Sequence, residues 1–233
     1  MCGRFVVPSS IAELLSVFDA IGGNAADWRP SYSVAPTDPA PIVREWIHDE
    51  TIKRDVVLAS WGLKPGWAKP GGPAPIQARL ESVAGNGMFR SAFAGQRCLV
   101  PMAGYVEWQQ RDDGRQPYFI HGADALLAAA GLYAARREAD AWEVSFTIIT
   151  RAARDASGDI HDRMPVFLSP DVWEQWLRPA KIVDREATLS MLDESSVAVA
   201  RTVAAYPVAR TVNTVRTLDR ADPALIAPMD TTG

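Results

Sequence analysis

The chain of 233 residues is 48% hydrophobic and 22% charged, the balance of a globular protein that buries a large core. This composition excludes a disordered, fibrous or collagen-like chain. The formal net charge of −4 excludes a uniformly basic surface for nucleic acid, although a local basic groove is compatible with it.

The first predicted element is a helix that begins at a capping box formed by Ser10 and Glu13. Apolar residues follow it at helical spacing, and Gly22 and Gly23 are predicted to end the helix. The proline-rich stretch 28–41 is predicted to be extended. Two strands joined by a polar turn are then expected over residues 42–47 and 55–62.

The middle of the chain is predicted to hold a Pro/Gly-rich loop over residues 63–75 and a short helix over residues 78–84. Arg111-Asp112-Asp113-Gly114 is predicted to form a hairpin turn, because Asp-Gly tolerates positive φ. Strands are predicted over residues 98–100, 105–109, 118–121, 126–133 and 143–150.

In the last third, Asp171 is predicted to cap a helix that holds Trp173 and Trp176 and that Pro179 ends. Short extended pieces are expected from residue 197 on. Strands follow one another instead of alternating with long helices, which predicts an α+β fold. We expect a mostly antiparallel, β-barrel-like core with a few flanking helices, in a single domain over residues 1–233.

Cysteine and histidine are scarce. The two cysteines, Cys2 and Cys98, are too few for a disulfide framework. Two cysteines and three histidines are few for a dedicated metal site, so we predict no metal or cofactor. Cys98 lies in an apolar stretch and is expected in the core. The sequence lacks a secretory h-region and a run of 18 apolar residues, so a cytoplasmic monomer with no membrane contact is expected.

Cys2 directly follows the initiator Met. Removal of Met1 would leave an α-amine (pKa about 7.7–8.0) and a thiol (pKa about 8.5) on adjacent carbons, both partly nucleophilic near neutral pH. Such a 1,2-aminothiol reacts specifically with an aldehyde: the amine forms a Schiff base and the thiol closes a thiazolidine ring. A buried apolar Cys2 is an equally compatible interpretation.

Glu107 lies within the aromatic strand Gly104-Tyr105-Val106-Glu107-Trp108. Desolvation there would raise its pKa toward the range useful for proton transfer. Strand alternation places Tyr105, Glu107 and Gln109 on one face. An edge-strand carboxylate that faces water explains the pattern equally well.

Two further groups of polar residues carry possible chemistry. His161 could act as a general acid or hold a substrate oxygen, and Arg163 could bind phosphate, although a structural role is the simpler interpretation of an isolated His. Gln77, Arg79 and Glu81 would line one side of an extended segment, or belong to a surface loop. Tryptophans near these arginines suit base stacking, but can equally be core residues. They are Trp61, Trp67 and Trp108.

Taken together, these motifs resemble one family, the SOS response-associated peptidase or abasic-site processing (SRAP) proteins. The resemblance covers residues 2–215 and leaves residues 216–233 as a tail. The motifs that carry it are Cys2-Gly3-Arg4-Phe5, Tyr32-Ser33-Val34-Ala35-Pro36, Trp61-Gly62-Leu63, Pro65-Gly66-Trp67, Gln77-Ala78-Arg79-Leu80-Glu81, Arg97-Cys98-Leu99-Val100-Pro101, Gly104-Tyr105-Val106-Glu107-Trp108 and His161-Asp162-Arg163-Met164-Pro165.

The resemblance implies that the protein traps abasic sites in single-stranded DNA, whose ring-opened sugar exposes an aldehyde. It implies Cys2 as nucleophile, Glu107 for proton transfer, His161 on the sugar oxygen, and Gln77 in the catalytic set. The implied DNA contacts are Arg4, Ser33, Trp61, Trp67, Arg79 and Arg163. The family name also implies a peptidase activity tied to exposing the cysteine, and a lyase activity is possible.

This sequence departs from the family pattern at two positions, since Gln77 and Ser33 stand where the family usually has Asn. These changes bear on rate and affinity more than on reaction type. Two other hypotheses remain open. Cys2 could be the nucleophile of a peptidase or amidohydrolase, with its own amine as base, or the chain could bind single strands without covalent chemistry.

Overall fold

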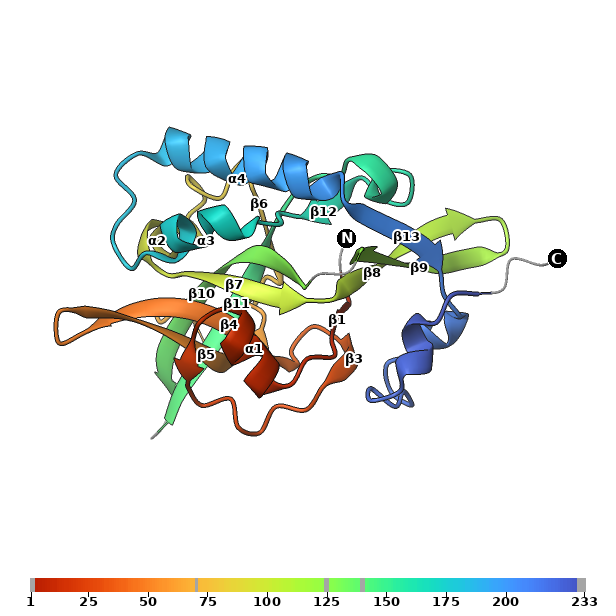
Figure 1. The fold of residues 1–233 in the computed structure, drawn as a ribbon, viewed down its shortest axis with the longest axis horizontal. Coiled ribbons are helices and arrows are strands. Elements are labelled where there is room, and N and C mark those ends of the chain that lie inside the picture. The colour runs from red at the N-terminus through yellow and green to blue at the C-terminus, as the bar shows by residue number, and fades with distance from the viewer. Residues whose placement is uncertain (1–2, 70, 124–125, 139–140, 230–233) are drawn as a thin grey trace.

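Two sheets form the frame of the structure, a computed structural model that describes residues 3–69, 71–123, 126–138 and 141–229 (Figure 1). In spatial order the larger sheet contains β12 (Arg163–Pro165), β11 (Ala141–Ala152), β10 (Leu127–Glu138), β7 (Arg97–Met102), β4 (Pro39–His48), β5 (Thr51–Trp61) and β2 (Ile21–Gly22). The smaller sheet contains β13 (Val203–Pro207), β9 (Gly114–Gly122), β8 (Gly104–Arg111), β1 (Phe5–Val7) and β3 (Ser31–Val34).

The larger sheet closes on itself. Strand β11 pairs in parallel with β5, with Ser145 opposite Ser60 and Phe146 opposite Trp61. The pairs β11–β10, β10–β7, β7–β4 and β4–β5 are antiparallel. A short strand, β6 (Gln77–Arg79), adds in parallel to β11. The predicted α+β fold with a mostly antiparallel, barrel-like core is therefore confirmed.

The predicted hairpins form with two-residue turns. Between β4 and β5, Asp49 and Glu50 both have positive φ, 48° and 59°, the geometry whose twist suits a two-residue hairpin. Between β8 and β9, Arg111 pairs with Gly114, and Gly114 has φ 115°. The hairpin turn predicted over residues 111–114 is confirmed, with Asp112 and Asp113 as the two residues between the strands and the positive φ at Gly114.

The smaller sheet joins the barrel where β7 continues into β8. The Ala103 amide donates to the Val6 carbonyl at 2.8 Å, which ties this junction to β1. At Gly104 an added Cβ would lie 2.4 Å from the Ile120 carbonyl oxygen. Only glycine lets β8 approach β9 this closely. On its other side Gly104 pairs with Val6 of β1.

Four α-helices occur among the described residues: α1 (Ile11–Val17), α2 (Arg90–Gly95), α3 (Trp173–Leu177) and α4 (Arg185–Ala200). The capping box at Ser10 is confirmed, because Ser10 Oγ accepts from the Glu13 amide and the Glu13 carboxylate accepts from the Ser10 amide. Helix α1 ends at Val17, before the predicted stop at Gly22. Figure 1 shows α4 along one side of the molecule, with α2 and α3 below it.

Three sequence predictions about helices need correction. Residues 78–84 are not a helix, because Gln77–Arg79 pairs with β11 and the rest forms turns. Asp171 does not cap α3, since it lies inside the 3₁₀ turn Pro170–Val172, whose N-cap is Ser169. The extended pieces expected from residue 197 begin only at β13, because α4 continues to Ala200.

Side chains alternate between two cores. Phe5 and Tyr105 point into the large core, where Phe5 packs edge-on against Trp61 with ring centroids 4.9 Å apart. Val6 and Val106 instead join a smaller cluster with Phe119. On this alternation Glu107 lies on the face of Tyr105, toward the large core.

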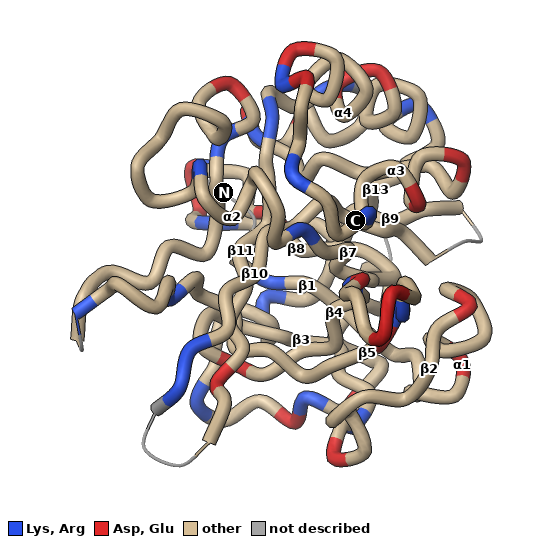
Figure 2. Tube along the Cα trace, turned by 90° about the vertical axis from the view of Figure 1, so that its left-hand side faces the viewer, with Lys and Arg blue, Asp and Glu red and all other residues tan. Residues whose placement is uncertain are grey.

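Charge is spread over the fold. Figure 2 shows basic and acidic residues in both the upper and the lower part of the molecule. No helix among the described residues is long and apolar enough to cross a bilayer.

Candidate functional site

Glu107 is the most perturbed carboxyl group of the site. Its side chain lies in the middle of β8 and the residue is 1% exposed. Burial raises its pKa from 4.5 to about 7, and the nearby charge of Asp162 acts in the same direction. A carboxyl group with this pKa exchanges a proton readily near neutral pH, which is the property of a general acid or base.

The beginning of the chain runs beside Glu107. In the antiparallel pair of β1 and β8, Phe5 lies opposite Tyr105. The Val106 amide donates to the Arg4 carbonyl at 2.9 Å, so the pairing extends one residue beyond β1 toward the N-terminus. Cys2, the predicted nucleophile, lies outside the described residues.

Arg4 is buried on the opposite face from Phe5. Its Nη1 donates to Ser33 Oγ at 2.9 Å and to the Val212 carbonyl at 3.0 Å. Its guanidinium carbon lies 5.8 Å from the centre of the Trp108 ring. Arg4 and Ser33, both predicted DNA contacts, are therefore hydrogen-bonded to each other, with the Ser33 hydroxyl as the acceptor.

His161 lies just before β12, in a turn tied to β8, because Gln109 Nε2 donates to the Asp159 carbonyl at 3.1 Å. The Arg163 amide donates to His161 Nδ1 at 3.0 Å. Asp162 Oδ1 is 2.9 Å from the same nitrogen. Burial lowers the pKa of His161, which favours the neutral ring near neutral pH. The fold thus brings the His161 turn and Glu107 to one region.

The segment 77–81 alternates as predicted. Ala78 and Leu80 are buried, whereas Arg79 and Glu81 are exposed and Gln77 is half-buried. The backbone pairing of Ile148 with Gln77 and of Thr150 with Arg79 aligns this segment along the end of β11. Gln77, Arg79 and Glu81 therefore share one side of the segment, beside the strand that leads to β12.

Arg163 contacts a carboxylate within the protein. Its Nη1 and Nη2 donate to Glu81 Oε1 and Oε2 at 2.7 and 3.1 Å. Nη2 also donates to the Thr150 carbonyl at 2.6 Å. The predicted phosphate contact of Arg163 would compete with Glu81, because both anions need the same fork of the guanidinium.

The three tryptophans considered for base stacking differ in their exposure and contacts. Trp61 is 0% exposed and its Nε1 donates to the Ile76 carbonyl at 2.9 Å. Trp61 is therefore a core residue, and its prediction as a DNA contact is wrong because no base can reach its ring. Trp67 is 62% exposed, at the edge of a cavity of about 220 Å³ that Met88 and Gln96 also line. Trp108 Nε1 donates to Asn213 Oδ1 at 2.6 Å.

Cys98 is buried in β7, where desolvation raises its pKa far above the ordinary value of a thiol. It is thus inert as a nucleophile. Groups of three His, Cys, Asp or Glu side chains that could hold a metal ion do not occur among the described residues.

Sequence reasoning missed several residues of the site. Thr150 contacts Arg163 and Val212 contacts Arg4, and no local pattern indicates either contact. Asp162 belongs to the motif around His161, but the motif does not show that its carboxylate contacts the ring. Glu81 belonged to a recognised motif, but its contact with Arg163 spans 82 positions.

Comparisons with known proteins agree with the motifs. The family model described as SOS response associated peptidase (SRAP) matches residues 1–215. The abasic site processing protein YedK of Escherichia coli is 32% identical over 223 residues, which cover 93% of this chain and 96% of YedK. The abasic site processing protein YoaM of Bacillus subtilis is 35% identical over 185 residues, 77% of this chain and 80% of YoaM.

The fold is also known from solved structures. A crystal structure of a protein from Bacteroides thetaiotaomicron matches with a TM-score of 0.80 and 20% identity. The match covers 98% of this chain and 100% of that chain, and at this identity it shows the shared fold alone.

Proposed function

Because this chain belongs to the SRAP family, we propose that it acts on abasic sites in DNA, as the names of its relatives say of them. The proposed product is a covalent thiazolidine link between Cys2 and an abasic site in single-stranded DNA. The observation that carries the proposal is the burial of Glu107, which raises its pKa to about 7, on the strand that pairs with Phe5 and Arg4 near the beginning of the described chain.

The reaction balances without an oxidant or a cofactor. Removal of Met1 frees the Cys2 α-amine, whose lone pair attacks the aldehyde carbon of the ring-opened abasic sugar. The resulting carbinolamine loses its hydroxyl as water and becomes a Schiff base. The Cys2 sulfur then adds to the same carbon, its proton passes to the nitrogen, and the five-membered ring closes. One water leaves overall.

Glu107 can carry out the proton transfers that these reaction steps require. The amine must lose a proton as it attacks, and the carbinolamine hydroxyl must gain one as it leaves. A single carboxyl group whose pKa lies near 7 can accept the first proton and donate it in the second step. The described chain begins at Gly3, one residue before the Arg4 carbonyl that accepts from the Val106 amide. The proposal requires Cys2 to reach Glu107 from that point, and consecutive Cα atoms are only about 3.8 Å apart.

The neighbouring residues fit the rest of the substrate. A neutral His161 can donate a hydrogen bond to the sugar oxygen and so favour ring opening. Arg79 is exposed beside Gln77, where it can contact a phosphate. Arg4 contributes a buried guanidinium group, whose pKa is lowered by burial and by the charge of Arg220. The positive charge of this group favours an anionic ligand nearby.

The test is formation of a denaturant-stable complex with four oligonucleotides: abasic single strand, abasic duplex, undamaged single strand and a single strand with a tetrahydrofuran analogue that lacks the aldehyde. The abasic single strand should give the most complex, and the last two should give none. Cys2→Ala should abolish the complex, whereas Cys98→Ala, the matched control, should retain it. A stable complex in Cys2→Ala, or none in the wild type, would overturn the proposal.

A further inference from the structure

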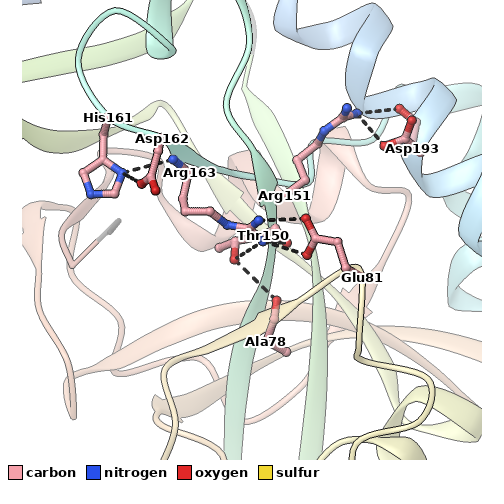
Figure 3. Close-up of polar contacts among 8 residues, drawn as sticks. All are labelled: Ala78, Glu81, Thr150, Arg151, His161, Asp162, Arg163 and Asp193. Atoms are coloured by element: carbon pink, nitrogen blue, oxygen red, sulfur yellow. Dashed lines mark hydrogen bonds and ion pairs between the residues drawn. The ribbon is translucent and has the colours of Figure 1, made fainter.

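One carboxylate lies among several arginines at the end of β11. Glu81 accepts from both terminal nitrogens of Arg163, as Figure 3 shows. The hydrogen bond from Arg163 lowers the pKa of Glu81, and the charge of Arg79 acts in the same direction. Glu81 is therefore an anion at neutral pH, and its two oxygens hold the guanidinium in a fixed plane.

The same Arg163 is held at three further points. Its Nη2 donates to the Thr150 carbonyl at 2.6 Å and to Thr150 Oγ1 at 3.3 Å. Its backbone pairs with Ala152 at the end of β11. Its amide donates to His161 Nδ1 at 3.0 Å. A contact at the end of the Arg163 side chain is thus linked, through one residue, to the imidazole ring of His161.

Two groups compete for Nδ1 of His161. The Arg163 amide can only donate, so its hydrogen bond requires an Nδ1 lone pair and places the ring proton on Nε2. Asp162 Oδ1, 2.9 Å from the same nitrogen, can only accept when it is ionised, so its contact requires a proton on Nδ1. In the neutral ring these two contacts correspond to different tautomers, and the position of the Arg163 amide decides between them.

We propose that Glu81 is a positioning residue: by clamping Arg163 it keeps the Arg163 amide against Nδ1 of His161 and so holds the ring proton on Nε2. The use of that proton, as a hydrogen bond to the abasic sugar oxygen, rests on the proposed function. The tautomer itself does not, because it is a property of the free protein.

A neighbouring ion pair provides a matched control. Arg151 lies one position from Thr150 on β11 and its Nη1 contacts Asp193 of α4 at 3.0 Å. Asp193 and Glu81 have similarly exposed side chains, 50% and 55%. Asp193 therefore also neutralises an arginine near the end of β11, but it makes no contact with Arg163 or His161 in the described structure.

The test is the ¹⁵N NMR spectrum of the full chain labelled at histidine, with His161 assigned from His161→Gln. Wild type and Asp193→Asn should both show a protonated Nε2 and an unprotonated Nδ1. In Glu81→Gln and in Arg163→Lys the two nitrogen shifts should move toward each other as the second tautomer appears. Unchanged His161 shifts in a folded Glu81→Gln variant would overturn the proposal, whether or not the protein reacts with DNA.

The rate of covalent complex formation supplies the second measurement. Glu81→Gln should slow it about 10- to 100-fold, the size of effect expected when a reacting group is misplaced by about an ångström. If Glu81 acts through Arg163, Glu81→Gln should have no further effect in an Arg163→Gln background. Additive effects of the two substitutions would contradict the positioning role, and Asp193→Asn should leave the rate unchanged.

Discussion

Buried carboxylates serve opposite purposes in two regions of this molecule. In the hairpin of β4 and β5, Asp55 accepts from Arg44 at 3.1 and 3.3 Å, and Glu45 accepts from Arg54 at 2.7 and 3.0 Å. On β8, burial dominates the environment of Glu107 and raises its pKa to about 7.

The difference shows what decides whether a buried acid is structural. A guanidinium that offers two N–H groups to each carboxylate joins neighbouring strand positions and fixes both side chains. Where desolvation dominates, the carboxyl group retains a proton near neutral pH and can exchange it with a ligand. By this criterion Asp55 and Glu45 belong to the scaffold and Glu107 belongs to the site.

The largest expected effect is on the rate of covalent complex formation, which should depend on Glu107 but not on a structural carboxylate such as Glu45. Glu107→Gln keeps the shape of the side chain but cannot carry a proton, so covalent complex formation should slow by about 10²- to 10⁴-fold. Glu45→Gln, the matched control, should leave the rate nearly unchanged, although it weakens the contact with Arg54. Initial rates with an abasic single strand measure both. Equal effects of the two variants would remove the distinction drawn between the regions.

The next prediction removes the ion-pair partner of Asp55 and so leaves it, like Glu107, as a carboxyl group in a buried environment. Arg44→Met removes the cation that Asp55 contacts and leaves a carboxylate buried at 8% side-chain exposure. Breaking a buried ion pair on one side costs about 3–5 kcal/mol, which urea unfolding at pH 7 would measure. A loss well below this range would show that the pair contributes little to stability.

A third prediction concerns the pH dependence of the free energy of unfolding that the raised pKa of Glu107 causes. Its pKa in the folded protein, about 7, is higher than its ordinary value of 4.5. Between these values the folded state holds more protons than the unfolded state, so stability falls as the pH rises through this window. Relative to Glu107→Gln, the wild type should lose up to about 3 kcal/mol between pH 4.5 and pH 8. Urea unfolding at several pH values tests this, and a flat difference would contradict the raised pKa.

Local sequence patterns predicted much of the frame. Strand-forming stretches of apolar residues located β4, β5, β10 and β11, and the capping box at Ser10 and Glu13 located the start of α1. Helix α4 escaped prediction because its sequence, rich in Ala and Ser, has no clear apolar stripe. The helix predicted over residues 78–84 is wrong because the first residues of this segment pair with β11, and local propensity cannot reveal such a contact.

The site was predictable where a residue's chemistry is visible in its immediate neighbours. Glu107 was identified because it stands between Val106 and Trp108 in an apolar strand, and its burial agrees with that interpretation. Trp61 was misplaced because an aromatic residue looks alike in sequence whether it packs in a core or stacks on a base. The contact between Glu81 and Arg163 depends on how β6 and β12 flank β11, so only the fold reveals it.

The intact mass of the protein, before and after reaction with abasic single-stranded DNA, shows directly whether Cys2 forms a thiazolidine with the abasic site. We expect a free protein without Met1 and a product whose mass is the sum of protein and DNA minus one water. Treatment with borohydride should leave that product unchanged, because a thiazolidine has no C=N bond to reduce. A product that gains two hydrogens would instead be a Schiff base. A protein that retains Met1 and still forms the product would contradict the role of the Cys2 amine.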